Sequence, residues 1–513
     1  MKDAMSAFAP APAFASSGPS TMTPVKWGLL AGLVALGALW GAFVAFQGMS
    51  AALICIAAIV FVFTIRDFRV GVLVMILIMP ISSSYMFPRA MFGVTGLNPL
   101  NVLLVGTFLS YILVAMPEGS IKRLMPWWVL PVFVLPIVLA GVNGMGHVKL
   151  IPPAFFDTEQ IDFKNDFGYM RDAVVKPLIL VAYSLIVGAA YARAREPHKF
   201  MVPMMVSMWL MGFMVIGYFL HSNVKFGQLA GEYARHFLSP LGMHANDLGR
   251  LYVTAIAILL FTWDRTRRPV LKTLLFLSMG LIGIALVLTF SRNAFMTVAL
   301  VIAIYLVSRR RNRKLLALAA VLIPLVVAFT PGAIWYRLEM GAGEGAAGVS
   351  AGRVSDIWTP LIAELFDKPF FGHGLGSVLW APAMRMGEMM QVTHPHSAYI
   401  GALLDFGVVG AILLIAFWFT VWKGFRKLAK DPSLSPQEQG FFEGCAVALV
   451  SFMVAGFVGS SFMPVPEQSF LWLGIGLMFG VRARHASERE AARTPRPAVD
   501  IPRRSRAAMG TRI

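Results

Sequence analysis

One segment of the sequence carries a pair of histidines that could perform proton chemistry. It runs from His394 to Gly410 and reads HPHSAYIGALLDFGVVG. Counted at 100° per residue, His396, Gly407 and Gly410 fall on one helix face, which predicts that a neighbouring helix packs closely beneath the imidazole. A neutral imidazole near the water boundary could accept a proton from a hydroxyl group. The alternative is that His396 is only a polar residue at a helix end.

Asp405 lies on the same predicted helix, nine residues after His396. This spacing places its carboxylate on nearly the opposite side of the helix from the imidazole. We therefore expect Asp405 to form an interhelical hydrogen bond and not a catalytic dyad with His396. His394 is an accessory candidate because only Pro395 separates it from His396.

Two arginines, Arg292 and Arg353, are candidates for binding an anion. Ser291-Arg292-Asn293 is the whole link between two apolar stretches, so Arg292 is expected at the level of the lipid headgroups. Arg353 begins the segment GRVSDIW, and its guanidinium could grip a phosphate through two parallel hydrogen bonds. The alternatives are that Arg292 binds lipid phosphate and that Arg353 is a charge flanking a helix.

The segment 352–376 has helical spacing of apolar residues from Val354 to Phe366, which predicts short helices lying in the membrane interface. Pro360 is expected to divide them, with Thr359 as the N-cap of the second helix. GHGLG, which contains His373, follows as a turn. Upstream, HANDLGR contains Arg250 and opens another helix, with Asn246 or Asp247 as the expected cap. Arg250 and His373 are further accessory candidates.

No metal site or disulfide is expected. The loop 143–173 holds several carboxylates, but solvated loop charges explain them better than metal ligands do. Cys55 and Cys445 both lie in apolar runs and lack the spacing of a zinc site.

The composition shows that a lipid bilayer must position these residues. Of the 513 residues 58% are hydrophobic and 14% are charged, and the mean hydropathy is +0.71. These values exclude a soluble enzyme, a coiled coil and a disordered regulator. We predict an all-α, polytopic membrane protein with about 12 to 14 transmembrane helices. The predicted spans are 27–46, 51–65, 70–87, 97–115, 124–142, 174–192, 200–220, 248–263, 273–290, 294–308, 315–330, 397–422, 441–460 and 466–481.

The positive charge predicts the orientation of the chain. There are 44 lysines and arginines against 26 acidic residues, a formal net charge of +18. Most of the basic residues fall in alternate loops and in the tail 482–513, which places both termini in the cytoplasm and the long loop 331–396 outside. Residues 1–24 are expected to be disordered and no cleaved signal peptide is expected. Residues 25–481 are expected to form one membrane domain. The basic tail needs no nucleic-acid partner, since topology explains it.

Together, these segments resemble the O-antigen ligase and polymerase superfamily of bacterial inner-membrane glycosyltransferases. SRNAF, GRVSDIW, KPFFGHGLG and HPHSAYIGALLDFGVVG occur in that family's order. His396-Ser397, nine residues and then Gly407-x-x-Gly410 agree with its pattern. The resemblance covers about 240–481. The earlier residues match only as a series of hydrophobic spans.

The resemblance implies a GT-C-like fold and an inverting, metal-independent glycosyltransferase without a cofactor. The donor would be a glycan linked to undecaprenyl pyrophosphate, used at the periplasmic face of the inner membrane in O-antigen or exopolysaccharide synthesis. His396 would be the base that activates an acceptor hydroxyl, and Arg292 and Arg353 would hold the pyrophosphate.

Four functions stay open at this point. We slightly favour a polymerase, which extends a chain on another lipid-linked unit, because the large outer loops could hold a second glycan. A ligase would join the finished glycan to lipid A core. A transporter or flippase would require ionisable residues deep in several helices, but charged residues inside the predicted spans are very rare, with Asp405 the clearest case, and this counts against that function. A structural partner of a polysaccharide-assembly complex would tolerate the loss of His396.

Overall fold

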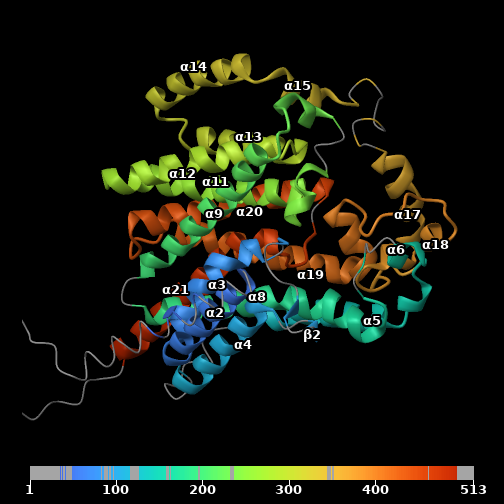
Figure 1. Cartoon of the computed structure of the whole chain (residues 1–513), viewed down its shortest axis with the longest axis horizontal. Coiled ribbons are helices and arrows are strands. Elements are labelled where there is room, and N and C mark those ends of the chain that lie inside the picture. The colour runs from blue at the N-terminus through green and yellow to red at the C-terminus, as the bar shows by residue number, and fades with distance from the viewer. Residues whose placement is uncertain are drawn as a thin grey trace, which may run out of the picture. The chain divides into compact units, whose positions relative to one another are not determined.

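The computed structural model describes residues 49–493 apart from short gaps, together with four separate positions near residue 40 (Figure 1). The gaps are 83, 86–89, 92–93, 96–97, 116–125, 158–160, 162, 195–196, 232–235, 342, 344–347, 349, 351 and 460. The predicted disordered segment 1–24, nearly all of the predicted span 27–46 and the tail from 494 onwards lie outside the described residues. The chain divides into two compact units, Met1–Val62 and Phe63–Ile513.

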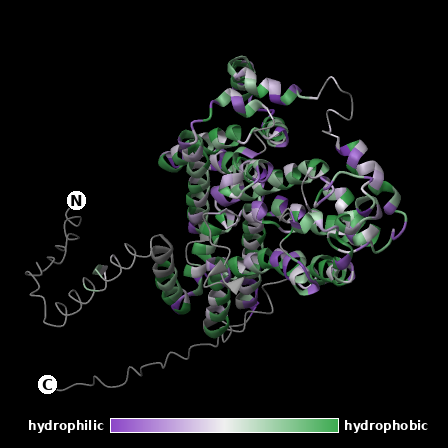
Figure 2. Cartoon of the chain, turned by 45° about the vertical axis from the view of Figure 1, so that its right-hand side comes forward, coloured by the Kyte–Doolittle hydropathy of each residue, from purple (hydrophilic) through white to green (hydrophobic). Residues whose placement is uncertain are grey.

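Helices make up nearly all of the regular structure that is described, and hydrophobic residues run along most of them (Figure 2). Helix α2, Met49–Arg66, begins in the first unit. The longer helices of the second unit are α3 (Phe68–Ile78), α4 (Pro99–Ser110), α5 (Leu135–Met145), α8 (Lys176–Arg193), α9 (Met201–His221), α11 (Ala245–Arg265), α12 (Pro269–Leu288), α13 (Arg292–Ser308), α14 (Arg313–Phe329), α15 (Gly332–Glu339), α19 (Ala398–Leu428), α20 (Pro436–Ala455) and α21 (Ser469–Arg493). The short helices are α6 (Ala154–Asp157), α7 (Asp166–Met170), α17 (Thr359–Glu364) and α18 (Pro382–Arg385).

The strands of the described chain are two-residue segments, β1 (Ala90–Met91) and β2 (Val94–Thr95), which pair antiparallel. The predicted all-α, polytopic membrane architecture is therefore confirmed.

Apolar helices of the described chain correspond to most of the predicted spans. Six helices in the described chain are long and apolar enough to cross a membrane, or seven if α14 and α15, which meet at an 89° bend, count as one span. The six helical stretches are 166–193, 201–221, 245–265, 269–288, 398–428 and 436–458. Five more predicted spans correspond to shorter apolar helices. By length and composition these helices agree with the predicted polytopic architecture.

Helices α11 and α20 lie in close contact because α20 presents two glycines to its neighbour. A Cβ atom on Gly440 would lie 2.5 Å from the Phe261 carbonyl oxygen, and one on Gly444 would lie 2.6 Å from the Ile258 Cα. Small residues four positions apart let two backbones approach in this way. The contact aligns the start of α11 with the end of α20, where the candidate site lies.

Helix α19 is broken at Gly407, whose backbone has φ 64° and ψ −174°. The predicted continuous helix face through His396, Gly407 and Gly410 is therefore wrong. The helix begins only at Ala398, with Ser397 as its N-cap, and His396 stands before it with φ 54°. A change of sign in φ interrupts the helical periodicity on which the prediction relied.

A loop, and not a neighbouring helix, fills the break in α19. Its backbone supplies the partners that the interrupted helix lacks. The Val408 N–H donates to the Pro369 carbonyl at 2.7 Å, and the His373 N–H donates to the Leu404 carbonyl at 2.7 Å. A Cβ on Gly372 would lie 2.5 Å from the Gly407 nitrogen, so the approach requires glycine there. The motif KPFFGHG therefore supplies backbone hydrogen-bond partners to the broken helix and is not simply a flexible turn.

The segment after Arg353 is a wide helical turn, Val354–Trp358, that continues directly into α17. The expected division at Pro360 is wrong. The Thr359 N–H donates to the carbonyl of Val354, five residues back, and this wider turn accommodates a proline that has no N–H. Thr359 is the first residue of α17 and not its cap.

Candidate functional site

A polar cavity of about 420 Å³ lies where α11 and α19 begin and where the chain continues beyond α20. The residues that line it are His244, Asn246, Asp247, Arg250, His394, Pro395, His396, Ser397, Ala398, Gly401, Ala402, Asp405, Phe406, Gly459, Ser461, Phe462, Met463, Val465 and Glu467. The structure thus brings together three predicted site residues, His396, His394 and Arg250. Arg292, Arg353 and His373 are not among the lining residues.

The two histidines form the most distinctive feature of this cavity. The imidazole rings of His394 and His396 lie 4.2 Å apart, centroid to centroid. Trp358 fixes the intervening turn, because its indole N–H donates to the Pro395 carbonyl at 2.8 Å. His396 adopts a left-handed backbone conformation that costs a non-glycine residue of the order of 1–3 kcal/mol. Such strained residues cluster at functional sites.

The protein around His394 favours its neutral form. Removal from bulk water, with the positive charge of Arg250, His244 and Arg353 nearby, lowers the pKa of His394 to about 4. Neutral imidazole has a free lone pair at pH 7 and can accept a proton. Arg353 is one of the positive charges that lower this pKa, although it does not line the cavity.

Arg250 joins three parts of the cavity wall through its terminal guanidinium nitrogens. They donate to the Asp247 carboxylate at 2.6 Å, to the Glu467 carboxylate at 2.9 Å and to the Gly459 carbonyl at 2.8 Å. Burial raises the pKa of the Glu467 carboxyl group. The Nε of Arg250 is buried without a hydrogen-bond partner among the described residues.

Arg292 is the first residue of α13. Of its two neighbours, Ser291 contacts a residue that lines the cavity, since its hydroxyl donates to the Asn246 side chain at 2.7 Å. The Asn293 amide donates to the carbonyl of Val458, the residue before the lining residue Gly459, at 3.3 Å. The guanidinium of Arg292 itself donates to the Met340 carbonyl at 2.8 Å. The predicted short link between the two helices is present, with Ser291 as N-cap.

His373 belongs to the packing behind the cavity. The Nε2 atom of the His373 ring lies 3.0 Å from the Glu364 carbonyl oxygen, and the His373 backbone N–H donates to the Leu404 carbonyl. Asp405 does line the cavity, and its carboxylate accepts hydrogen bonds from the Ser377 N–H and hydroxyl at 3.0 and 2.8 Å. The expected role of Asp405, a hydrogen bond to another element, is thus confirmed.

Sequence reasoning missed Glu467 and misplaced the cap of α11. The N-cap is His244, whose Nδ1 accepts from the Asn246 N–H at 3.2 Å. This leaves Asp247 available to bind Arg250. The available signal for Glu467 was an acidic residue between Pro466 and an apolar run. In the described part of the chain no group of three or more His, Cys, Asp or Glu residues is arranged to hold a metal ion.

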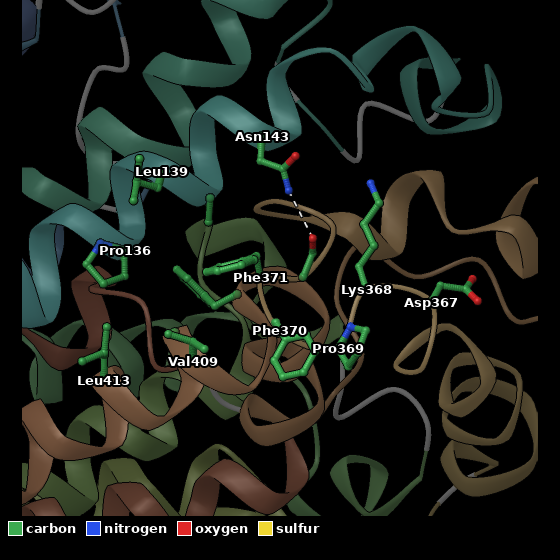
Figure 3. Close-up of a pocket in the computed structure, with 14 residues that line it drawn as sticks. Pro136, Leu139, Asn143, Asp367, Lys368, Pro369, Phe370, Phe371, Val409 and Leu413 are labelled. Carbon is green, nitrogen blue, oxygen red and sulfur yellow. Dashed lines mark hydrogen bonds between the residues drawn. The ribbon is translucent and has the colours of Figure 1, made fainter.

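A second, largely apolar cavity of about 680 Å³ lies between α5, the loop 367–372 and α19 (Figure 3). The Asn143 amide donates to the Gly372 carbonyl there at 3.2 Å. Phe406 lines both cavities, but none of the predicted site residues lines this one.

The fold and the polar cavity define a polytopic membrane protein with a site at the ends of its helices. Comparison with known proteins shows which family part of the chain resembles. Residues 277–415 match a family described as O-antigen ligase. The chain is also 23% identical over 243 residues to an O-antigen ligase of Pseudomonas aeruginosa. That alignment covers 47% of this chain and 55% of the relative, about half of its length. These matches confirm the resemblance to the O-antigen ligase and polymerase superfamily.

The matched region contains Arg292, Arg353 and both histidines of the cavity. It ends before Glu467 and begins after Arg250. Arg250 and Glu467, which form a buried ion pair in the cavity wall, therefore lie on either side of the matched region in the sequence.

Proposed function

We propose that this protein is a membrane glycosyltransferase that transfers a glycan from undecaprenyl pyrophosphate to an acceptor hydroxyl in surface-polysaccharide synthesis. The observation that carries the proposal is the pair of imidazoles, 4.2 Å apart, in a cavity that also contains Arg250. The family match supports the class of activity. The position of the cavity at the helix ends suits a donor whose lipid stays in the bilayer while its diphosphate lies at the surface.

His396 is the general base of the proposed reaction. Its imidazole takes the proton of the acceptor hydroxyl, whose oxygen then bonds to the anomeric carbon while the bond from that carbon to the pyrophosphate oxygen breaks. Attack from the face opposite the leaving group inverts the anomeric centre. The nearby imidazole of His394, neutral because its pKa is low, adds no positive charge that would oppose proton uptake by His396.

Arginine side chains compensate the charge that develops on the leaving pyrophosphate. The positive charge of Arg353 contributes to the low pKa of His394, and Arg292 follows Ser291, whose hydroxyl binds the cavity residue Asn246. Guanidinium groups suit this role because they stay charged and bind phosphate through two hydrogen bonds. The reaction drawn in this way uses no nucleotide and no metal ion.

The acceptor separates a ligase from a polymerase. The family description and the Pseudomonas relative both carry the name O-antigen ligase, which favours transfer of glycan to lipid A core over the polymerase activity that the large outer loops suggested. On either assignment the protein lies in the inner membrane with the cavity at the periplasmic face and both termini in the cytoplasm. Other polysaccharide-assembly proteins are expected partners.

Surface-glycan analysis of a deletion strain tests the proposal. The strain is complemented with the wild-type chain, with His396→Ala, or with His485→Ala, which removes a histidine of α21 that hydrogen-bonds to Ser433 far from the cavity. A ligase defect leaves full-length lipid-linked glycan that does not reach lipid A. Single repeat units indicate a polymerase, and loss of outward transport of the lipid-linked unit indicates a flippase. Unchanged glycan with His396→Ala contradicts the catalytic role.

A further inference from the structure

A third cavity, of about 250 Å³, lies at the opposite ends of the helices that form the candidate site. Helices α11, α13 and α19 begin at or beside the polar cavity and end here, and α20 runs back from this end. The lining residues are Phe261, Arg265, Ile304, Ser308, Arg309, Trp422, Arg426, Ala429, Lys430, Glu443, Ala446, Val447 and Val450. Four of these are cationic, and Glu443 is the acidic member of the set.

The carboxylates at this end already have cationic partners. Glu443 accepts from Arg265 at 2.9 Å and from Arg309 at 3.0 Å, and Asp264 accepts from Arg309 at 2.8 Å. The side chains of Glu443 and Arg309 are only 18% and 20% exposed, so this network is a stable part of the wall. Two of the four cations are thereby compensated.

The other two cations, Arg426 and Lys430, have no carboxylate partner among the described residues. Arg426 lies in the last turn of α19, Lys430 follows two residues after the helix ends at Leu428, and both side chains are exposed. The guanidinium of Arg426 lies 5.4 Å from the centre of the Trp422 ring, which orients it without neutralising it. An anion that bound between Arg426 and Lys430 would complete the charge balance of the cavity.

The lining of the cavity changes from charged to apolar along the helix axes, from the helix ends inwards. On each helix the charged residue stands nearer the helix end, and apolar residues follow about one turn deeper: Phe261 beneath Arg265, Ile304 beneath Arg309, and Val447 beneath Glu443. A free phosphate ion would use only the charged level. A phospholipid would use both, with its headgroup at the cations and the start of an acyl chain against the apolar residues.

We infer that this cavity binds the phosphate headgroup of an anionic phospholipid. Arg426 and Lys430 supply the contacts to the phosphate, and the network of Arg265, Arg309 and Glu443 holds the helix ends that form the cavity. The site is separate from the proposed glycosyltransferase cavity and does not depend on that function. A lipid bound here would bridge α13, α19 and α20 at the end of the bundle opposite the candidate site.

Native mass spectrometry of the purified full-length protein tests this inference. Phosphatidylglycerol is the anionic probe, phosphatidylcholine the neutral comparison, and glycerol 3-phosphate the water-soluble headgroup. The test variant is Arg426→Gln/Lys430→Gln. The control is Lys423→Gln/Lys427→Gln, which removes the same charge from the same helix end at residues that do not line the cavity. The single variant Lys430→Gln changes an exposed side chain and serves if the double variant does not fold.

We expect the test variant to bind phosphatidylglycerol roughly thirtyfold more weakly than the wild-type chain, which corresponds to about 1 kcal/mol for each of the two cations removed. The control should change by less than about twofold, because Lys423 and Lys427 do not line the cavity and so do not contact the bound headgroup. Equal weakening by both double variants would show only general attraction to the membrane surface and would overturn the inference. Competition by glycerol 3-phosphate as strong as that by the lipid would assign the site to a soluble anion instead.

Discussion

Arg250 and Glu467, 217 residues apart in the chain, form a buried ion pair of 2.9 Å in the wall of the polar cavity. Their side chains are 11% and 15% exposed. The pair connects the start of α11 to the segment between α20 and α21, and so holds together two elements that flank the histidines. Because this ion pair is buried in the cavity wall, the shape of the site depends on it.

Removal of Glu467 should destabilise the protein strongly. In Glu467→Leu the Arg250 charge keeps only Asp247 as a carboxylate partner, and breaking a buried pair typically costs about 3–5 kcal/mol. Glu467→Gln keeps a hydrogen-bond acceptor and should cost less. Thermal unfolding of the detergent-solubilised chain measures both. The control is Glu488→Gln, which breaks an exposed pair with Arg484 worth less than about 1 kcal/mol. Equal unfolding temperatures for Glu467→Leu and the control would contradict this structural role.

Titration of His394 should occur near pH 4 and not near the usual 6.5. Because the folded state lowers this pKa, protonation is less favourable in the folded chain than in the unfolded chain. The contribution of His394 to the free energy of unfolding is therefore fully present above pH 6.5 and is lost as the pH falls towards 4. Histidine NMR signals, assigned with His394→Gln, measure the midpoint. Arg353→Gln removes a neighbouring positive charge and should raise it. An unshifted midpoint of 6.5 in the wild-type chain would refute the expected environment.

The backbone at Gly407 should not accept a side chain. Gly407→Ala requires alanine at φ 64° and brings its Cβ against the backbone of Phe370. The conformation alone costs about 1–3 kcal/mol, and the contact with backbone adds to it. Gly280→Ala is the matched control, since a Cβ there meets nothing within 4 Å and alanine favours a helix. A thermal melt should show a clear loss for Gly407→Ala and no loss for Gly280→Ala. The reverse order would contradict the broken helix.

Arginine should be required, and not merely positive charge, at the two proposed pyrophosphate positions. Arg353→Lys and Arg292→Lys keep the charge but lose the planar pair of donors, so each should weaken donor binding by about tenfold. Saturation of transfer with a lipid-linked donor measures this as an increase in KM. Arg385→Lys, an exposed arginine at the end of α18, is the comparison. Unchanged KM in both test variants would remove the arginines from the donor site.

The sequence was sufficient to predict features that depend on local chemistry. Apolar runs locate most of the membrane helices, and Asp405 forms the expected hydrogen bond to another element, at Ser377. It did not predict the path of the backbone at His396 and Gly407, because a residue with positive φ leaves no trace in hydrophobic periodicity. Glu467 was missed for a different reason. Its importance comes from Arg250, a partner that only the tertiary fold brings close.

The central claim is that the imidazole of His396 performs proton transfer in this cavity. Glycan transfer by the purified chain in proteoliposomes, with a lipid-linked donor and a defined acceptor, measures it directly. Loss of a general base lowers a rate by about 10²–10⁴-fold, so His396→Ala should transfer at least about a hundredfold more slowly while donor binding is retained. Transfer by His396→Ala at a rate within about twofold of the wild-type chain would contradict the claim.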